Sequence, residues 1–156
     1  MSLNHINTNE LDANFKSLKI NNQPINTSTT IKEFINFSGN FGVQGERYLQ
    51  PWSGSGTSSA NLANQISPYK SIKIVGMICR KNNSQPDTNF ILYKSDITLN
   101  NFVDLQTINV PTGFTFGTSL VLNIPISSGE CLWVRSSSTG TGNPQDVQVT
   151  ITYEQV

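Results

Sequence analysis

Few residues in this chain have the types and spacing that catalysis requires. The only histidine is His5, so a Ser-His-Asp or Cys-His site would need the polar N-terminal segment to fold back over a nucleophile. The ten Asp and Glu residues are scattered and form no recognisable paired motif. The two carboxylates of a glycosidase come together only in the folded protein, so the sequence leaves such a pair open. The interpretation we favour is that these carboxylates are solvated and structural. We therefore predict no catalytic residues, and we predict that the chain is not an enzyme.

Metal and phosphate sites lack their sequence signals as well. Cys79 and Cys131 are the only cysteines, lie far apart and fit no metal-ligand spacing. Both sit in apolar surroundings, which favours buried free thiols over a disulfide. Gly54-Ser55-Gly56 has neither the Lys-Ser/Thr tail nor the following helix of a phosphate loop. The sequence predicts no metal and no cofactor.

Aromatic side chains at loop edges provide the remaining recognition chemistry. Trp52 follows Pro51, Tyr48 is close by, and Tyr69 follows Pro68. Exposed Trp and Tyr rings can stack on sugars or anchor a protein partner. The alternative is that these rings cover the core or lie in a subunit contact, which is commoner for large aromatics. Tyr48, Trp52 and Tyr69 are the candidate ligand-binding residues.

The composition gives a surface that is polar without being charged. Charged residues are 13% of the chain, the formal net charge is +0, and Asn, Ser and Thr make up roughly a third of all residues. A chain without excess positive charge has no electrostatic basis for binding nucleic acid or anionic lipid. The polar, weakly charged surface suits an extracellular particle or a secreted module. Residues 1–10 lack the regions of a signal peptide, and no apolar run approaches the ~18 residues of a membrane span. We expect no nucleic-acid partner and no membrane insertion.

Short β-rich runs must position these residues, because 156 residues suffice for one domain with a real core. The clearest run is 146–154, where Val147, Val149, Ile151 and Tyr153 alternate with polar residues at the period of a half-buried strand. Further candidate strands are residues 31–38, 47–49, 71–80, 89–94, 104–110, 120–124 and 130–135. About eight strands at this spacing predict an all-β fold, a jelly-roll-type β-sandwich.

The segments between these strands predict loops and an arm. Residues 53–59 and 136–144 are rich in Ser, Thr and Gly and predict exposed loops. Residues 9–18 have the spacing of a short helix that Asn9 could cap. We predict that residues 1–30 form an N-terminal docking arm and that residues 31–156 form the head.

Two of the predicted strands are apolar on both faces. Residues 71–80 and 130–135 therefore predict one face in the core and the other against a partner. On this basis Ile74, Met77 and Trp133 are the candidate residues of an oligomer interface.

The end of the chain resembles a known family. Residues 122–135 read Leu-Asn-Ile-Pro-Ile-Ser-Ser-Gly-Glu-Cys-Leu-Trp-Val-Arg, and a Ser/Thr-rich segment and an alternating strand follow them. This stretch resembles the last hairpin of C1q/TNF-like jelly rolls, where a Gly-acid turn such as Gly129-Glu130 precedes an apolar strand. Other β-sandwiches, including viral and lectin modules, share the motif. Domains of that family are generally homotrimers, so the resemblance implies self-association.

The arm carries a second resemblance. Residues 17–25, Ser-Leu-Lys-Ile-Asn-Asn-Gln-Pro-Ile, resemble the strand-turn phrases that precede head domains in viral and phage fibre proteins. Together these features suggest a homotrimeric, fibre-like or capsid-associated head on a virion surface, made in the host cytoplasm without a signal peptide. It would dock on other virion or assembly proteins through residues 1–30 and mediate host attachment. The alternative is a carbohydrate-binding, lectin-like module that recognises a cell-surface glycan.

Overall fold

The computed structural model describes residues 19–20, 23–24, 31–40, 45–52, 64–83, 86–139 and 146–156. The chain divides into two units, residues 1–30 and residues 31–156. In the first unit the short strands β1 (Lys19–Ile20) and β2 (Gln23–Pro24) pair in antiparallel orientation. The predicted helix over residues 9–18 and the predicted loop over residues 53–59 lie outside the described residues.

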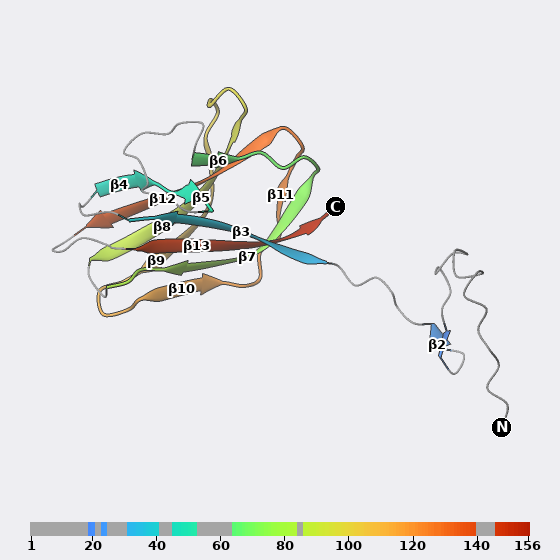
Figure 1. The fold of residues 1–156 in the computed structure, drawn as a ribbon, viewed down its shortest axis with the longest axis horizontal. Helices are drawn as coiled ribbons and strands as arrows, with labels where there is room; N and C mark the ends of the chain where they lie inside the picture. The colour runs from blue at the N-terminus through green and yellow to red at the C-terminus, as the bar shows by residue number, and fades with distance from the viewer. Residues whose placement is uncertain are drawn as a thin grey trace. The chain divides into compact units, whose positions relative to one another are not determined.

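The second unit is a sandwich of two antiparallel sheets (Figure 1). In sheet I the strand order is β10-β7-β13-β3-β5, and β11 also pairs with β7. In sheet II the order is β4-β12-β8-β9, and β6 also pairs with β12. The strands are β3 Lys32–Gly39, β4 Gly45–Tyr48, β5 Gln50–Pro51, β6 Gln65–Ile66, β7 Ile72–Arg80, β8 Asp87–Asp96, β9 Val103–Val110, β10 Phe116–Ser119, β11 Ile124–Ile126, β12 Glu130–Thr139 and β13 Val147–Gln155.

The chain crosses from one sheet to the other at most of its connections. From β3 to β8 every step changes sheet, and β8 and β9 then form a hairpin within sheet II. The chain returns to sheet I for β10 and β11, to sheet II for β12, and ends in sheet I with β13. None of the described residues is in an α-helix. This two-sheet, crossing architecture confirms the predicted all-β, jelly-roll-type sandwich.

Alternating side chains from both sheets fill the core. In β13 the buried residues Val147, Val149 and Ile151 alternate with polar residues on the outer face, as the sequence pattern predicts. Large side chains from five other strands meet them, and each is fully buried. They are Phe37, Ile74, Met77, Phe90, Leu92, Val110, Leu132 and Val134. Burial of these apolar groups is the main stabilising term of the sandwich.

The predicted strand over residues 120–124 is wrong. Strand β10 ends before it, at Ser119, and β11 begins at its last residue, Ile124. Ser119 at the end of β10 pairs with Met77, and Ile124 at the start of β11 pairs with Ile74. The edge therefore uses more residues than β7 does over the same interval. The surplus loops outward, which leaves Leu120 and Val121 exposed.

The predicted loop over residues 136–144 starts too early. Residues 136–139 continue β12 and pair with β8 on one side, from Ser136 opposite Phe90 to Thr139 opposite Asp87. Strand β4 pairs with the same stretch on the other side. Two neighbouring strands supply the backbone hydrogen bonds, and this pairing overrides the turn preference of a serine run.

A buried lysine joins the turns that connect the sheets beyond β7 and β9. The Lys81 side chain is only 3% exposed, and its ammonium donates to the carbonyl oxygens of Pro86 (2.5 Å), Val110 (3.0 Å) and Pro111 (3.2 Å). The Lys81 backbone N–H donates to Thr115 O at 2.9 Å. Burial lowers the pKa of this ammonium, and the Asp87 carboxylate opposes the shift. Lys81 therefore fixes the turn that leads into β10.

Candidate ligand-binding pocket and association surface

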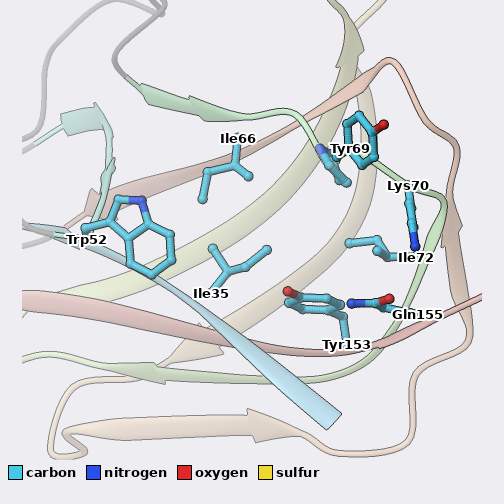
Figure 2. A pocket seen from close by; sticks show the side chains of 9 residues that line it. Ile35, Trp52, Ile66, Tyr69, Lys70, Ile72, Tyr153 and Gln155 are labelled. Atoms are coloured by element: carbon cyan, nitrogen blue, oxygen red, sulfur yellow. The ribbon is translucent and has the colours of Figure 1, made fainter. Parts of the chain in front are cut away.

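A pocket of about 300 Å³ opens between the ends of the two sheets (Figure 2). This volume lies at the lower end of the range for small-molecule sites, roughly 300–1,000 Å³. The lining side chains come from β3, β6, β7, β13 and the loops after β5 and β6. They are Ile35, Trp52, Ile66, Pro68, Tyr69, Lys70, Ile72, Tyr153 and Gln155. The pocket thus has an aliphatic floor, aromatic walls and a few polar groups.

Trp52 is held at the edge of the pocket by its backbone. Its φ angle is 72°, a left-handed conformation that is unusual for a bulky residue and costs on the order of 1–3 kcal/mol. The Trp52 N–H donates to Asn36 O at 2.8 Å, and the preceding strand β5 pairs with β3. The indole nevertheless remains 70% exposed. The backbone therefore presents this ring to solvent instead of burying it in the core.

Tyr69 and Lys70 form the opposite wall in Figure 2, with Ile35 and Ile66 between them and Trp52. Tyr69 is 91% exposed. Lys70 makes no ion pair within the described part of the chain. Two aromatic faces and one cationic donor therefore border the same hollow.

The wall at the bottom of Figure 2 carries neutral polar groups from β13. The Tyr153 hydroxyl donates to Glu33 Oε2, and Gln155 Nε2 donates to Glu33 Oε1 at 2.7 Å. The hydrogen bond to Glu33 and burial raise the pKa of Tyr153 to about 12. Tyr153 is therefore neutral at pH 7. The Tyr153 hydroxyl gives its only proton to Glu33, so its oxygen can only accept from a ligand, whereas the Gln155 amide keeps an acceptor oxygen and a second N–H.

Two of the three candidate ligand-binding residues meet in this pocket, and the third does not. Tyr48 lies on β4 in sheet II, where its ring and that of Trp133 pack in a T-shaped arrangement with centroids 6.3 Å apart. It covers an apolar cluster and does not line the pocket. The sequence reasoning missed Tyr153 and Gln155, since only the pairing of distant segments brings β13 to this pocket. It also missed Lys70, although Lys70 directly follows Tyr69.

The structure corrects the prediction that Ile74, Met77 and Trp133 lie at an oligomer interface. All three are 0% exposed within a single chain, so their side chains present no surface to a second copy. Ile74 and Met77 belong to the main core because a bulge in the pairing of β7 with β13 turns both inward. The predicted partner face of β12 is covered by the chain itself.

A loop between β8 and β9 provides that cover. Phe102 packs on Trp133 with ring centroids 5.5 Å apart, and Leu99 packs against the same cluster. The Trp133 indole N–H donates to Ser95 Oγ at 2.7 Å. These contacts build a second small core on the outer face of sheet II.

The Asp96 carboxylate organises this covering loop. It accepts hydrogen bonds from Thr98 N (2.9 Å), Thr98 Oγ1 (2.6 Å), Asn100 N (3.0 Å) and Asn101 Nδ2 (2.7 Å). These bonds, the one from the Thr98 hydroxyl first, lower the pKa of Asp96. A carboxyl group whose pKa is lowered by folding stabilises the fold above its unfolded pKa of about 3.9 and loses that effect as pH falls through the lower value.

We therefore expect Asp96→Asn to be less stable than the parent at pH 7 and to approach it at acid pH. Urea midpoints measured from pH 7 down to pH 2 provide the test, with Asp104→Asn as the control for an exposed carboxylate. An Asp96→Asn deficit that stays constant over this range would contradict the role given to the Asp96 charge.

Strand β10 lies at an edge of sheet I (Figure 1). Exposed apolar side chains lie on this strand and beside it. We call them the β10 apolar segment: Phe114, Phe116, Leu120 and Val121, which are 59%, 62%, 65% and 96% exposed. The outer face of sheet I, which also carries the exposed Phe34, adjoins this segment. Its central cross-strand row is uncharged and contains Asn36, Thr150, Ile78 and Thr118. The ion pair Lys73–Glu154 (2.8 Å) and Arg80 lie outside this row.

Metal-ligating clusters are absent from the described part of the chain. No three of its His, Cys, Asp and Glu side chains gather in a group that could hold a metal ion. The same residues contain no helix that is long and apolar enough to cross a membrane. Cys79 and Cys131 are buried free thiols, which confirms the prediction for both.

The domain is thus a jelly-roll-type β-sandwich with an aromatic pocket at one end and an apolar segment at a sheet edge. In structure it is similar to the globular domain of zebrafish complement 1qA protein, with a TM-score of 0.45 and 10% identity over 81% of this chain and 98% of that chain. It is also similar to Eiger TNF from S. frugiperda (TM-score 0.38, 13% identity, 80% and 94% covered). Murine APRIL is a third such structure (TM-score 0.39, 7% identity, 76% and 98% covered). No protein-family model and no curated protein matches the chain.

Proposed function

We propose that the chain is a non-enzymatic structural protein of a virus particle, whose jelly-roll head forms a homotrimer and whose residues 1–30 dock on another particle component. The observation that carries the proposal is the β10 apolar segment. Four large apolar side chains, each at least 59% exposed within eight residues, are costly to leave in water. A partner that covers them removes this cost.

A second copy of the head offers a suitable partner surface. The uncharged row across the outer face of sheet I can be buried without leaving an ion unpaired. Thr150 Oγ1 already donates to Asn36 Oδ1 at 2.7 Å, which satisfies part of its hydrogen-bonding capacity within the chain. The β10 apolar segment of one copy packing on this row of the next is a heterologous contact, and such a contact forms a ring of three when each copy is rotated by one third of a turn from the last. The number three follows from the resemblance of residues 122–135 to C1q/TNF-like heads.

The remaining parts of the proposal rest on the sequence. A polar, nearly uncharged surface suits a particle exterior, and the strand-turn phrase at residues 17–25 resembles those that precede viral fibre heads. Host attachment would then be the task of the exposed head. The lectin-like alternative has its own support in the pocket that contains Trp52 and Tyr69.

Deletion of residues 1–30 tests the division of labour between arm and head. We expect light scattering to give three chain masses for both the full chain and residues 31–156, because the interface residues all belong to the head. We expect only the full chain to co-purify with assembled particles. Monomeric mass for both proteins would exclude the homotrimer, and particle association of the truncated chain would exclude docking by the arm.

A further inference from the structure

The pocket between the ends of the two sheets has the kinds of side chain that a saccharide-binding site requires. A pyranose ring is amphipathic, and its C–H faces pack against aromatic rings while its hydroxyl groups need hydrogen-bond partners at the rim. Trp52 and Tyr69 supply the exposed rings, on opposite sides of the hollow in Figure 2. Gln155 and Tyr153 supply polar groups at the wall.

The strained backbone at Trp52 supports a binding role for its ring. A left-handed conformation at a bulky residue is unfavourable, and here it is retained by pairing with β3 although the indole gains little burial. A ring that is fixed before the ligand arrives loses little conformational entropy on binding. The Trp52 backbone is therefore held in position before a ligand binds, as a stacking platform requires.

The charge of the pocket selects among saccharides. Lys70 is the only ionisable side chain with a formal charge among the lining residues, and its ammonium has no carboxylate partner in the described part of the chain. The nearest carboxylate on β3, Glu33, is not a lining residue, and it accepts hydrogen bonds from Tyr153 and Gln155. An anionic group on the ligand would complement Lys70.

We propose that this pocket binds a carboxylate-bearing pyranose, with Trp52 and Tyr69 packing on its C–H faces and Lys70 pairing with its carboxylate. The volume of about 300 Å³ suits one or two sugar rings. This inference is independent of the proposed trimer, since every lining residue belongs to one chain.

The test uses two matched sugars and the full chain. Methyl β-glucuronide and methyl β-glucoside differ only in the carboxylate, and the methyl α-glycoside of N-acetylneuraminic acid provides a second acidic probe. Titration calorimetry should give tighter binding of the acidic sugars than of the glucoside. The difference should shrink between about 0.01 M and 1 M salt, as the screening length falls from about 30 to 3 Å.

Two variants separate stacking from charge. Trp52→Ala should weaken the binding of the acidic sugars by about tenfold or more, as expected for loss of a central aromatic contact. Lys70→Gln should weaken the acidic sugars by about two- to fivefold and leave the glucoside unchanged. Ile97→Ala is the control, because Ile97 is 62% exposed and is not a lining residue.

Three results would overturn the proposal: no binding of either acidic sugar, unchanged binding by Trp52→Ala, or an acidic preference that persists in Lys70→Gln. The solution mass of each variant, measured in parallel, keeps this outcome separate from that of the trimer. A chain that is trimeric but binds no sugar would leave the proposed function standing without the pocket ligand.

Discussion

A chain carrying Val121→Asp should be recovered as a folded monomer. In the proposed trimer each Val121 enters a contact with the next copy, so the substitution would bury three carboxylates without partners. Each buried, unpaired charge costs several kcal/mol, and about 4 kcal/mol corresponds to a thousandfold weaker association. Leu120→Asp should act in the same way. Light scattering or sedimentation of the purified variants measures this change directly.

The fold of these variants should survive, since residues 120 and 121 lie between β10 and β11 and take no part in strand pairing. Circular dichroism would verify it. Ile97→Asp is the control, because Ile97 is 62% exposed, close to the 65% of Leu120, but lies in the loop between β8 and β9. We expect it to remain trimeric. A folded Val121→Asp chain with three chain masses would contradict the proposed interface.

The second large effect should come from Lys81→Met. Methionine fills similar space, but it cannot donate to the three carbonyl oxygens that the ammonium joins. A buried carbonyl that loses its partner costs roughly 1–3 kcal/mol, and relaxation toward water recovers part of the sum. We expect the free energy of unfolding to fall by about 2–4 kcal/mol, measured by urea denaturation.

Lys73→Met is the control for the loss of a lysine charge. Lys73 is partly exposed on the outer face of sheet I and forms a surface ion pair with Glu154 at 2.8 Å. Such pairs contribute about 0–1 kcal/mol. Equal losses of stability in the two variants would show that the hydrogen bonds from Lys81 to the three carbonyl oxygens contribute no more than a surface ion pair does.

Lys81→Met should also weaken self-association. Lys81 binds Pro111 O through its side chain and Thr115 O through its backbone, and these residues flank Phe114 in the turn before β10. Loosening of this turn would let the β10 apolar segment move. The stability and the association of the head are therefore coupled through one side chain.

The sequence predicts strands best where one face is buried and the other is wet. Residues 147–154 alternate without interruption, and the structure has β13 there. The failures have a common cause in pairing between distant segments. Residues 136–139 look like a loop on their own but lie between β4 and β8, and residues 120–124 look like a strand but carry the outward loop beside β7.

The site was only partly predictable for the same reason. Trp52 and Tyr69 could be identified because each large aromatic follows a proline in a polar stretch. Nothing in the sequence places Tyr153 or Gln155 beside them, whereas Lys70 directly follows Tyr69. The covered face of Trp133 was also unpredictable, since the loop that supplies Phe102 has no pattern that identifies it as a lid.

The two cysteines bear on where the molecule can work. Burial raises the pKa of both thiols, Cys79 in sheet I and Cys131 in sheet II, so neither readily forms the reactive thiolate. The head has no cross-link to form or to lose within its described residues. Its stability should therefore be the same in reducing and in oxidising surroundings, as the proposed assembly inside a cell and release of a particle would require. Maturation of this domain needs neither an oxidant nor a disulfide isomerase.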